Sequence, residues 1–571
     1  MSDLQLNEKP ACNLVSMRAD GQQHPLFLIH PSASRMRYAA SLARWIDDNI
    51  PVYALEVGHI NGDAYVESIA QLYVKAIREV RAAGPYRIAG HAFGGIIAYE
   101  IANQLLGADE VVEFVGLIET RIEADHPTPT DDSEGKYLLR LIGQNLDQAS
   151  PHIVEQLDTL SNANDVQGML ALCAGQDFNP LPEEFHDQPQ RLVIDTHYAH
   201  HKASTTYFVQ SIHTATWLFN DIEHAEAAAG EWKNILGQHL RVVPIDPDSS
   251  SNEKDASAKK LGETISTILS NLKPDDADFQ HQRYFPTITI QSGNHGSPAL
   301  FCIPGAGGSA TSFFALAQEL GAGTPVYGLQ PRGLDASLVP HVDVVGAASV
   351  YRRAIQKVSP KGPYDILGHS FGGWVAFEIA QQLLAAGEQI STLIILDAEA
   401  PSADARKTER WSRVDMLMKL IDVYELSIEA SLDITSEQLE TLGHDQQLEL
   451  LLSRLARANI MRTNDGQALR GIVRVFETNL NTRYEPAAVF PGTIHLVGVA
   501  ESSVWGDAEP EAIDHGEYIS NWQSHASDVY FWEAPGNHMT LLRLPNVQAL
   551  AHKLTSFLQD NWYRCNSAPH A

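Results

Sequence analysis

The sequence of this chain of 571 residues contains an internal repeat. Leu26-Phe27-Leu28-Ile29 recurs as Leu300-Phe301-Cys302-Ile303, an offset of 300 − 26 = 274 positions. Gly84-Pro85-Tyr86 recurs as Gly362-Pro363-Tyr364 at a similar offset of 362 − 84 = 278 positions. A period this long indicates tandem globular domains rather than a solenoid. The length of the chain, which exceeds what one hydrophobic core fills, agrees with that interpretation.

Each copy alternates short apolar strands with amphipathic helices, a pattern typical of a mostly parallel sheet with helices on both faces. We expect the first copy to span residues 13–272 and the second to span residues 284–561. A polar linker that contains proline, residues 273–283, separates the two copies. The tail, residues 562–571, includes the polar stretch 564–569, and because no apolar periodicity is evident we expect the tail to be frayed.

The second copy contains the turn Gly368-His369-Ser370-Phe371-Gly372, between an apolar strand at 363–367 and a helix that opens at Gly373. G-x-S-x-G between a strand and a helix is the nucleophile elbow of α/β-hydrolases, which exposes a serine hydroxyl above the sheet. The flanking glycines permit the sharp bend. The predicted fold class is therefore α/β, with two tandem α/β-hydrolase domains. The first copy repeats the turn as Gly90-His91-Ala92-Phe93-Gly94, with alanine in place of serine.

Each copy also carries a long helical insertion after the elbow. In the second copy the insertion spans about residues 403–482. Inserted helices above the catalytic edge of a sheet usually form a lid. We predict a lid that shapes the substrate pocket, with a purely structural cap as the alternative. Two runs of apolar residues in the insertion have helical spacing: Leu417, Leu420, Ile421 and Tyr424, and then Leu448, Leu451, Leu452 and Leu455.

A serine nucleophile needs a base within hydrogen-bond reach and an acid that orients the base, in the chain order Ser, Asp or Glu, His. The preferred acid is Asp397, which ends an apolar strand and so lies at the edge where open α/β sheets place their sites. Asp507, after a later strand, is the alternative. The preferred base is His538, in the loop after the last strand. We expect the competing His369, inside the elbow, to be structural.

A tetrahedral intermediate also needs two backbone N–H donors aimed at its oxyanion. Phe371, directly after the proposed nucleophile, offers one donor. The glycine-rich loop at residues 304–308 follows the first apolar strand of the domain and offers the other, with Ala306 as the predicted donor. The glycines in that loop allow the backbone to approach a substrate closely.

The stretches 368–380 and 393–401 resemble the terminal thioesterase domains of nonribosomal peptide synthetases and of their polyketide relatives. The resemblance extends over both copies. Asp397 lies 397 − 370 = 27 residues after Ser370, which resembles the arrangement in that family and favours Asp397 over Asp507.

The resemblance implies a substrate that arrives as an acyl or peptidyl thioester on the phosphopantetheine arm of a carrier protein. The chain would move to Ser370 and leave by hydrolysis or by macrocyclisation onto an internal hydroxyl or amine. The enzyme itself would bind no cofactor and no metal. Tandem thioesterases of this kind occur on assembly lines for cyclic lipopeptides and depsipeptides. No carrier signature precedes Asn13, so we expect an excised fragment or a separately encoded enzyme.

The first copy departs from the pattern at each catalytic position. Ala92 replaces the nucleophile, Glu119 replaces the acid, and no histidine occurs in the segment 246–252 after the last strand. The loop at 30–34 lacks the glycines of its counterpart. Several coincident departures favour a naturally inactive domain over a single engineered substitution. We expect such a domain to hold the carrier, to shape the substrate channel or to support the second domain.

One question about the first copy and two alternatives to a chain-releasing enzyme remain open at the level of sequence. His200 and His201 are possible displaced bases of the first copy, although a place in its lid fits them better. A stand-alone editing thioesterase is disfavoured by the tandem layout. A carrier-docking scaffold without catalysis is disfavoured for the second copy by its complete set of Ser370, Asp397 and His538.

Bulk properties exclude other partners and suggest a compartment. The net charge of -31 argues against nucleic acid and against anionic membranes, because phosphates would be repelled. No apolar run approaches the length of a membrane span, and residues 1–4 show no start of a signal peptide. The four cysteines are far apart and form no C-x-x-C pair. We therefore expect a cytoplasmic, reducing environment.

Overall fold

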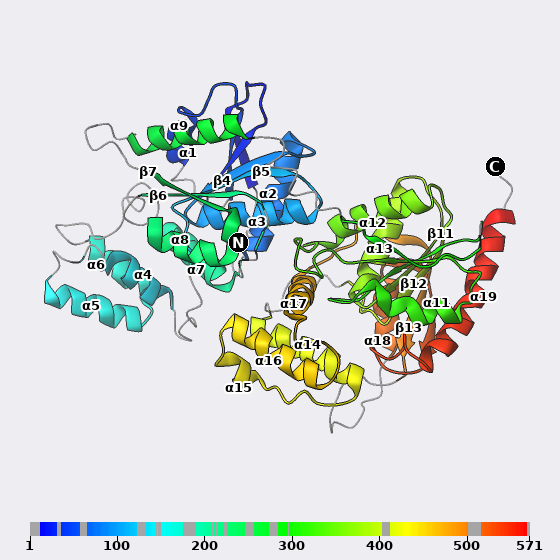
Figure 1. Ribbon diagram of the computed structural model, residues 1–571. Helices are drawn as coiled ribbons and strands as arrows, with labels where there is room; N and C mark the ends of the chain where they lie inside the picture. Colours follow the sequence, from blue (N-terminus) through cyan, green and yellow to red (C-terminus); the bar gives the residue numbers. More distant parts are fainter. Residues whose placement is uncertain are drawn as a thin grey trace, which may run out of the picture. The chain divides into compact units, whose positions relative to one another are not determined.

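A computed structural model of the chain shows two compact units, with the boundary between them at His281 and Gln282 (Figure 1). The bounds predicted for the two domains, residues 13–272 and 284–561, stay predictions, and the predicted linker, residues 273–283, lies outside the described part. The structure describes residues 12–30, 36–57, 65–122, 133–143, 146, 150–174, 190–207, 209, 211–212, 214–221, 225–245, 256–272, 284–294, 296–401, 411–500 and 515–567.

The first unit is built on a seven-stranded sheet in the order β1-β3-β2-β4-β5-β6-β7. Its strands are β1 (Cys12–Arg18), β2 (Leu26–His30), β3 (Val52–Val57), β4 (Tyr86–His91), β5 (Val112–Ile118), β6 (Thr216–Asp221) and β7 (Leu240–Ile245). Its helices are α1 (Met36–Ala43), α2 (Val66–Val80), α3 (Phe93–Gly107), α4 (Glu134–Gly143), α5 (Pro151–Asn162), α6 (Val166–Ala174), α7 (Gln190–Thr206), α8 (Ala225–Leu236) and α9 (Ala256–Asn271), with a short 3-10 turn at Gly237–His239.

The second unit repeats this design with the strand order β8-β10-β9-β11-β12-β13-β14 when its sheet is read from the corresponding edge. Its strands are β8 (Thr287–Gln291), β9 (Leu300–Ile303), β10 (Val326–Leu329), β11 (Tyr364–His369), β12 (Ile390–Leu396), β13 (Phe490–Val499) and β14 (Ala526–Ala534). Its helices are a 3-10 turn at Ala310–Phe313, α11 (Phe314–Glu319), α12 (Val344–Val358), α13 (Phe371–Ala385), α14 (Arg413–Ile428), α15 (Ser436–Glu440), α16 (His444–Arg457), α17 (Gly466–Asn481), α18 (His515–Gln523) and α19 (Asn546–Ser567).

Both sheets are parallel except at one edge, where β1 pairs antiparallel with β3 and β8 pairs antiparallel with β10. The two copies share even a local irregularity. The register shifts between Tyr86 and Arg87 where β4 meets β5, and between Tyr364 and Asp365 where β11 meets β12. The same strand order and the same irregularity confirm that one fold occurs twice.

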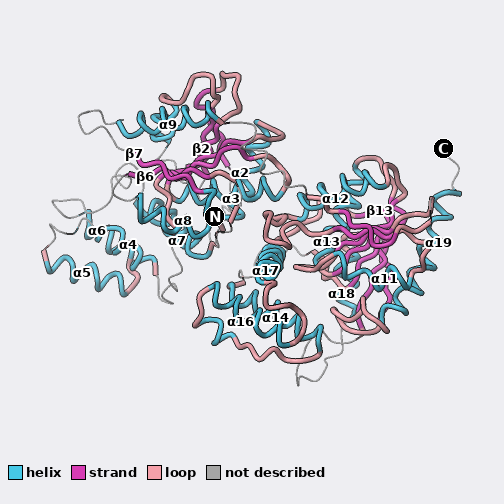
Figure 2. The backbone as a smooth tube through the Cα atoms, viewed as in Figure 1, coloured by secondary structure: helices cyan, strands magenta, loops and turns pink. Residues whose placement is uncertain are grey.

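Helices cover both faces of each sheet, as the alternating pattern predicts (Figure 2). In the second unit, α12 and α13 pack on one face, and α11 and α19 pack on the other. In the first unit, α1 and α9 lie on one face, while α2, α3 and α8 lie on the other (Figure 1). The inner strands are apolar throughout because both of their faces are buried; β9, for example, is buried at all of its residues.

The helical insertions form the predicted second layer above each sheet. In the first unit the insertion lies between β5 and β6 and contains α4 to α7. In the second unit it lies between β12 and β13 and contains α14 to α17, which share a core of their own. Helix α14 begins with a capping box between Ser412 and Asp415, and its predicted apolar residues Leu417, Leu420 and Ile421 are buried.

One prediction about the end of the chain is wrong. The last helix was expected to end near Asn561 and to give way to a tail, but α19 continues to Ser567. Leu558, Trp562 and Cys565 have helical spacing in the sequence, a signal that the prediction overlooked. No helix in the described ranges combines the length and the apolarity that crossing a bilayer requires.

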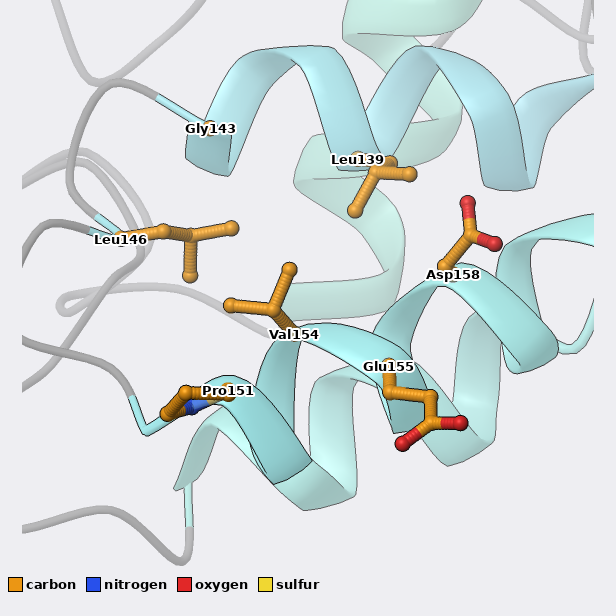
Figure 3. A pocket seen from close by; sticks show the side chains of 7 residues that line it. All are labelled: Leu139, Gly143, Leu146, Pro151, Val154, Glu155 and Asp158. Atoms are coloured by element: carbon orange, nitrogen blue, oxygen red, sulfur yellow. The ribbon is translucent and has the colours of Figure 1, made fainter.

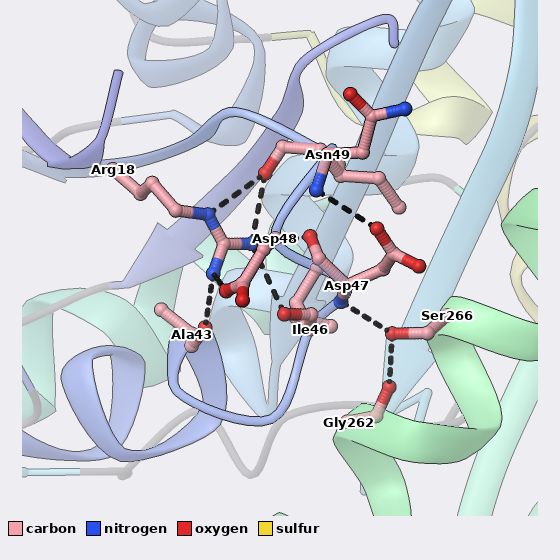
Figure 4. Close-up of polar contacts among 9 residues, drawn as sticks. Arg18, Ala43, Ile46, Asp47, Asp48, Asn49, Gly262 and Ser266 are labelled. Atoms are coloured by element: carbon pink, nitrogen blue, oxygen red, sulfur yellow. Dashed lines mark hydrogen bonds and ion pairs between the residues drawn. The ribbon is translucent and has the colours of Figure 1, made fainter. Parts of the chain in front are cut away.

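In the first unit, Arg18 organises the loop between α1 and β3 (Figure 4). Its guanidinium donates to four backbone carbonyls in that loop, those of Ala43, Ile46, Asp47 and Ile50, at 2.6 to 3.3 Å. The loop is also bonded to α9, because the Ser266 hydroxyl accepts a hydrogen bond from the Asp47 N–H at 2.9 Å. A single partly buried cation thus binds carbonyls of the loop that follows α1.

A buried glutamate–tyrosine pair ties the end of each lid to the helix that follows the elbow. In the second unit the Tyr484 hydroxyl, just after α17, donates to Glu378 of α13 at 2.6 Å. In the first unit Tyr207, just after α7, donates to Glu100 of α3 at 2.7 Å. Burial raises the pKa of Glu100 to about 7. The repetition of this pair in both copies indicates a structural role in seating the lid.

Tyr484→Phe is therefore expected to destabilise the protein by about 1.5–3 kcal/mol, because it removes a donor from a buried carboxylate. Urea denaturation of the full chain measures the change. Tyr327→Phe is the matched control, since the Tyr327 hydroxyl makes no hydrogen bond within the described residues. A loss no larger than that of the control would contradict the proposed anchoring role.

Candidate functional site

Ser370 occupies a sharp turn between β11 and α13. Its backbone has φ 54° and ψ -130°, in a region that non-glycine residues rarely adopt. The turn is closed by two hydrogen bonds. The Ser370 N–H donates to the Leu396 carbonyl at 2.9 Å, and the Ser370 carbonyl accepts from the Gly373 N–H at 2.7 Å. The strand–turn–helix geometry expected of a nucleophile elbow is present, although the helix starts two residues earlier than predicted, at Phe371.

Steric crowding explains the glycines of the elbow. A Cβ on Gly368 would overlap the backbone of Gly372, and a Cβ on Gly372 would overlap the Ile303 carbonyl at the end of β9. Glycine is therefore required at both positions for the strand and helix to approach this closely. The two glycines of the G-x-S-x-G motif are therefore explained by close packing around the turn that carries Ser370.

Asp397 and His538 come together beside this turn. Asp397 follows β12, with φ 44°, and its N–H donates to the Val497 carbonyl of β13 at 2.8 Å. The His538 Nδ1 lies 2.6 Å from the Asp397 Oδ2. Because a carboxylate accepts, Nδ1 carries the proton and Nε2 is left as the acceptor. The other acid considered, Asp507, lies outside the described residues.

The loop that carries His538 is shaped by Asn537, a residue whose role the sequence reasoning missed. The buried Asn537 side chain accepts from the N–H groups of Met539 and Thr540, each at 2.9 Å. The Thr540 hydroxyl in turn accepts from the Asn537 N–H at 2.9 Å. Asparagine commonly fixes turns in this way, so the pair Asn537 and Thr540 around the histidine was the available signal.

The predicted oxyanion loop runs directly against the elbow. A Cβ on Gly305 would lie 3.0 Å from the Ser370 Cβ, so the backbone of the loop passes next to the proposed nucleophile. Ala306 follows in the same loop, and Phe371 opens α13 on the other side of the serine. Both predicted donors therefore flank Ser370. Their assignment as oxyanion donors stays a prediction.

The lid of the second unit packs on this loop. Ala306 packs against the lid core, and a Cβ on Gly307 would lie 3.1 Å from the Phe476 Cβ and 3.3 Å from the Ile472 carbonyl of α17. Helix α17 thus packs against the loop at residues 304–308, which lies next to the elbow. The lid is also bonded to the loop of the proposed base, His538. Arg543, on that loop, donates to the Ser427 carbonyl at 2.6 Å and to the Ser427 hydroxyl at 2.5 Å.

Gly307→Ala is expected to slow the labelling of Ser370 by a fluorophosphonate about tenfold or more, because the new methyl group would push the loop away from α17. Gly321→Ala is the matched control. Both glycines have positive φ, 62° and 86°, but the Gly321 Cβ would meet nothing within 4 Å. Equal labelling rates in the two variants would show that contact between the loop and α17 does not matter for the site.

The first unit keeps the backbone of the elbow without the nucleophile. Ala92 has φ 51° and Glu119 has φ 49°, close to the values at Ser370 and Asp397. The Ala92 N–H donates to the Ile118 carbonyl at 2.8 Å, as its counterpart does in the second unit. The turn therefore has the same strained backbone in the first unit, although alanine replaces serine there.

The remaining groups of the first site are arranged differently. The Glu119 carboxylate pairs with the Nε2 of His91, inside the elbow, at 3.0 Å. His200 of α7 stacks on Phe93 at 4.5 Å between ring centroids, and burial lowers its pKa to about 3. His201 is on the same lid helix and stacks on Tyr137. Both histidines are lid residues, as expected. The segments 31–35 and 246–255, which bear on the missing oxyanion loop and base, lie outside the described residues.

A hollow of about 650 Å³ opens in the lid of the first unit, between α4 and α5 (Figure 3). Leu139, Leu146 and Val154 face into it, and Glu155 and Asp158 lie at its rim. It contains none of the predicted site residues of either unit. The candidate site is accordingly assigned from the elbow and its neighbours and not from this hollow.

The fold and the site together define the class: two tandem α/β-hydrolase domains, each with an elbow at the carboxyl edge of its sheet. A family model described as "Thioesterase domain" matches residues 24–167 and 298–558. These two matches cover more than half of the chain and fall one in each unit. The chain belongs to the thioesterase domain family, which confirms the family predicted from its motifs.

Curated relatives match parts of the chain. Microperfuranone synthase of Emericella nidulans is 27% identical over 305 residues, 51% of this chain and 32% of that protein. Indigoidine synthase of Streptomyces lavendulae is 35% identical over 150 residues, 26% of this chain and 11% of that protein. Nonribosomal peptide synthetase acyN of Ascocoryne sarcoides is 26% identical over 293 residues, 49% of this chain and 30% of that protein. The chain thus spans about a third or less of each.

Solved structures with a similar fold include two thioesterases. The wild-type Vlm2 thioesterase domain is 24% identical with a TM-score of 0.34, and the match covers 47% of this chain and 96% of that one. The type II thioesterase BorB from the borrelidin biosynthetic cluster is 21% identical with a TM-score of 0.35, covering 49% of this chain and 98% of that one.

Proposed function

We propose that the second unit is a chain-releasing serine thioesterase of a nonribosomal peptide or mixed polyketide assembly line. One observation carries the proposal: the hydrogen bond of 2.6 Å between His538 and Asp397, beside the strained turn that presents Ser370. Ser370, Asp397 and His538, the proposed nucleophile, acid and base, follow three strands of one sheet, β11, β12 and β14. Such a constellation performs acyl transfer.

In the first half-reaction His538 Nε2 takes the proton of the Ser370 hydroxyl as its oxygen attacks the thioester carbonyl. The C=O electrons move to oxygen, and the N–H groups of Ala306 and Phe371 are the proposed donors to that oxyanion. The tetrahedral intermediate collapses, the C–S bond breaks, and the thiolate leaves with the proton from His538. The products are a free thiol and an acyl ester on Ser370.

In the second half-reaction His538 removes a proton from water, or from a hydroxyl or amine at the far end of the acyl chain. The resulting nucleophile attacks the ester carbonyl, and His538 returns the proton to the Ser370 oxygen as the C–O bond breaks. Water gives a linear acid, and an internal nucleophile gives a macrocycle. Asp397 stabilises the imidazolium in both halves without itself gaining a proton.

The proposed donor of the acyl group is a carrier protein whose phosphopantetheine arm holds the thioester. A relative named as a nonribosomal peptide synthetase supports this partner. We propose that the phosphopantetheine belongs to the carrier as part of the substrate and that the enzyme binds no cofactor of its own. The proposal concerns the function of this chain within such an assembly line, since the matches span only part of each relative.

We also propose that the first unit does not catalyse this reaction and acts as a non-catalytic partner domain. The loss of the serine and the pairing of Glu119 with His91 support this assignment. Without a nucleophile the elbow cannot form an acyl ester, and Glu119 is engaged by a histidine within the elbow itself.

A synthetic peptidyl thioester tests the proposal for the second unit. We expect release of free thiol that depends on Ser370, followed by mass spectrometry of the product. A product lighter by one water than the free acid identifies macrocyclisation, and the free acid identifies hydrolysis. If the parent protein releases thiol no faster than Ser370→Ala does, the proposal is overturned.

A further inference from the structure

His369, the residue just before the proposed nucleophile, is buried and bonded to the loop of the proposed base. Its Nε2 lies 3.0 Å from the backbone carbonyl oxygen of His538. The two imidazole rings are 4.7 Å apart between centroids and tilted by 35°. The His369 side chain therefore makes both a polar and a packing contact with His538, from the elbow side.

The chemistry of the acceptor fixes the protonation of this side chain. A backbone carbonyl only accepts, so Nε2 of His369 must carry the proton and donate it. Burial, with a further contribution from His538, lowers the pKa of His369 to about 3. His369 is thus a neutral, permanent donor across the pH range in which an enzyme works, and it is not a second base.

The same side chain also lies near the predicted oxyanion loop. Its Nδ1 would lie 3.4 Å from a Cβ placed on Gly305. One buried ring is consequently bonded to the His538 loop and lies close to position 305. It adjoins Ser370 through the chain itself.

We propose that His369 is a positioning residue that sets the distance of the His538 loop from the nucleophile elbow. This inference rests on the proposed function, since it assigns His369 a role in placing the proposed base. The hydrogen bond to Asp397 holds one atom of the His538 ring, the Asn537 side chain bonds within the loop, and Arg543 joins the loop to the lid. The bond from His369 joins the backbone of this loop to the elbow.

The sheet explains why such a tie is needed. The elbow follows β11, whereas the His538 loop follows β14, and β12 and β13 lie between them. No strand pairing joins the two ends directly. A displacement of about 1 Å between reacting groups costs on the order of 100-fold in rate, so a bond across this gap has a large effect on turnover.

The first unit supplies an internal comparison. His91 is the counterpart of His369, and its Nε2 pairs with Glu119 at 3.0 Å. The same ring nitrogen that faces a loop carbonyl in the second unit faces the acid in the first. The histidine Nε2 thus has a different partner in the unit that lacks the serine. This difference is expected if His369 supports catalysis in the second unit.

The test is a matched pair of variants in the full chain. His369→Gln keeps an amide donor at the end of a side chain of similar reach, and His369→Met has a similar length without a donor. We expect His369→Met to lower kcat for thioester release about 10- to 100-fold with KM little changed, and His369→Gln to stay within about fivefold of the parent. His91→Met, in the first unit, is the control and is expected to leave kcat unchanged.

A second background separates positioning from a general structural role. In His538→Ala there is no base to position, so adding His369→Met is expected to change the residual rate less than twofold. An equal loss in both backgrounds, or equal losses in the glutamine and methionine variants, would overturn the inference. If the methionine variant does not fold, His369→Asn, whose amide is too short to reach the carbonyl, replaces it with the same expectation. Release by the parent that does not depend on Ser370 would instead refute the proposed function.

Discussion

Ser370→Ala is expected to lower kcat for thioester release by at least ~10,000-fold, the largest effect predicted for any substitution in this chain. The substitution removes the atom that forms the acyl ester. It leaves the backbone in place, because alanine already occupies the same strained turn in the first unit, at φ 51° against 54° for Ser370. Loss of activity therefore cannot be attributed to collapse of the elbow. Thiol release from a peptidyl thioester measures the effect.

The control for this result is the reverse change in the first unit. Ala92→Ser restores a hydroxyl on the preserved turn, but Glu119 is paired with His91, and residues 246–272, from β7 to the end of the first copy, contain no histidine. We expect no gain in thioester release when Ala92→Ser is combined with Ser370→Ala. Recovery of even about one hundredth of the parent rate would show that the first site lacks only its serine, and that an engineered substitution explains Ala92.

Asp397→Asn is expected to lower kcat by ~1,000- to 10,000-fold while leaving KM within a few fold. The carboxylate accepts the Nδ1 proton of His538 at 2.6 Å and so leaves Nε2 free to take the proton of Ser370. An amide can present its NH₂ group instead, which stabilises the tautomer with the proton on Nε2. That tautomer cannot act as the base. The steady-state rates and the thermal midpoint of the variant measure the two effects separately.

Glu119→Gln in the first unit is the matched control for the acid. It changes the equivalent carboxylate, which has nearly the same backbone conformation, and is expected to leave kcat unchanged. If Asp397→Asn lost less than about tenfold, Asp397 would not be the orienting acid, and the role would pass to another carboxylate such as Asp507.

Much of the fold follows from the sequence because its strongest signals are local. The elbow requires glycine at 368 and 372 for steric reasons, so the motif itself reports how closely β11 and α13 approach. Asp397 could be proposed as the acid because it ends an apolar strand, and the carboxyl ends of parallel strands lie at one edge of the sheet. The repeat then extended these assignments from one copy to the other.

The features that sequence reasoning missed depend on contacts between distant segments. His369 was expected to be structural, and it does not contact the substrate in the proposed mechanism, but its bond to the His538 carbonyl joins positions that are 169 residues apart. Likewise, nothing near Arg543 in the sequence indicates that it holds Ser427 of the lid. The pairing of Glu119 with His91 reuses a nearby histidine in place of the expected one, which a search for the usual order of residues does not detect.

The length of α19 was missed for a different reason. The polar stretch 564–569 dominated the prediction of a tail, although Leu558, Trp562 and Cys565 keep the helical spacing i, i+4, i+7. The helix continues to Ser567. Propagation of an existing helix adds one hydrogen bond per residue and needs no new nucleus, so a helix can run past its last packed turn.

The central claim is that the chain has two elbows and one working nucleophile, Ser370. The most direct measurement is the intact mass of the full chain after exhaustive reaction with a fluorophosphonate, followed by peptide mapping of the adduct. We predict one adduct per chain, on the peptide that contains Ser370, and none in Ser370→Ala. A second adduct within residues 13–272, or a parent protein that takes up no label, would contradict the account.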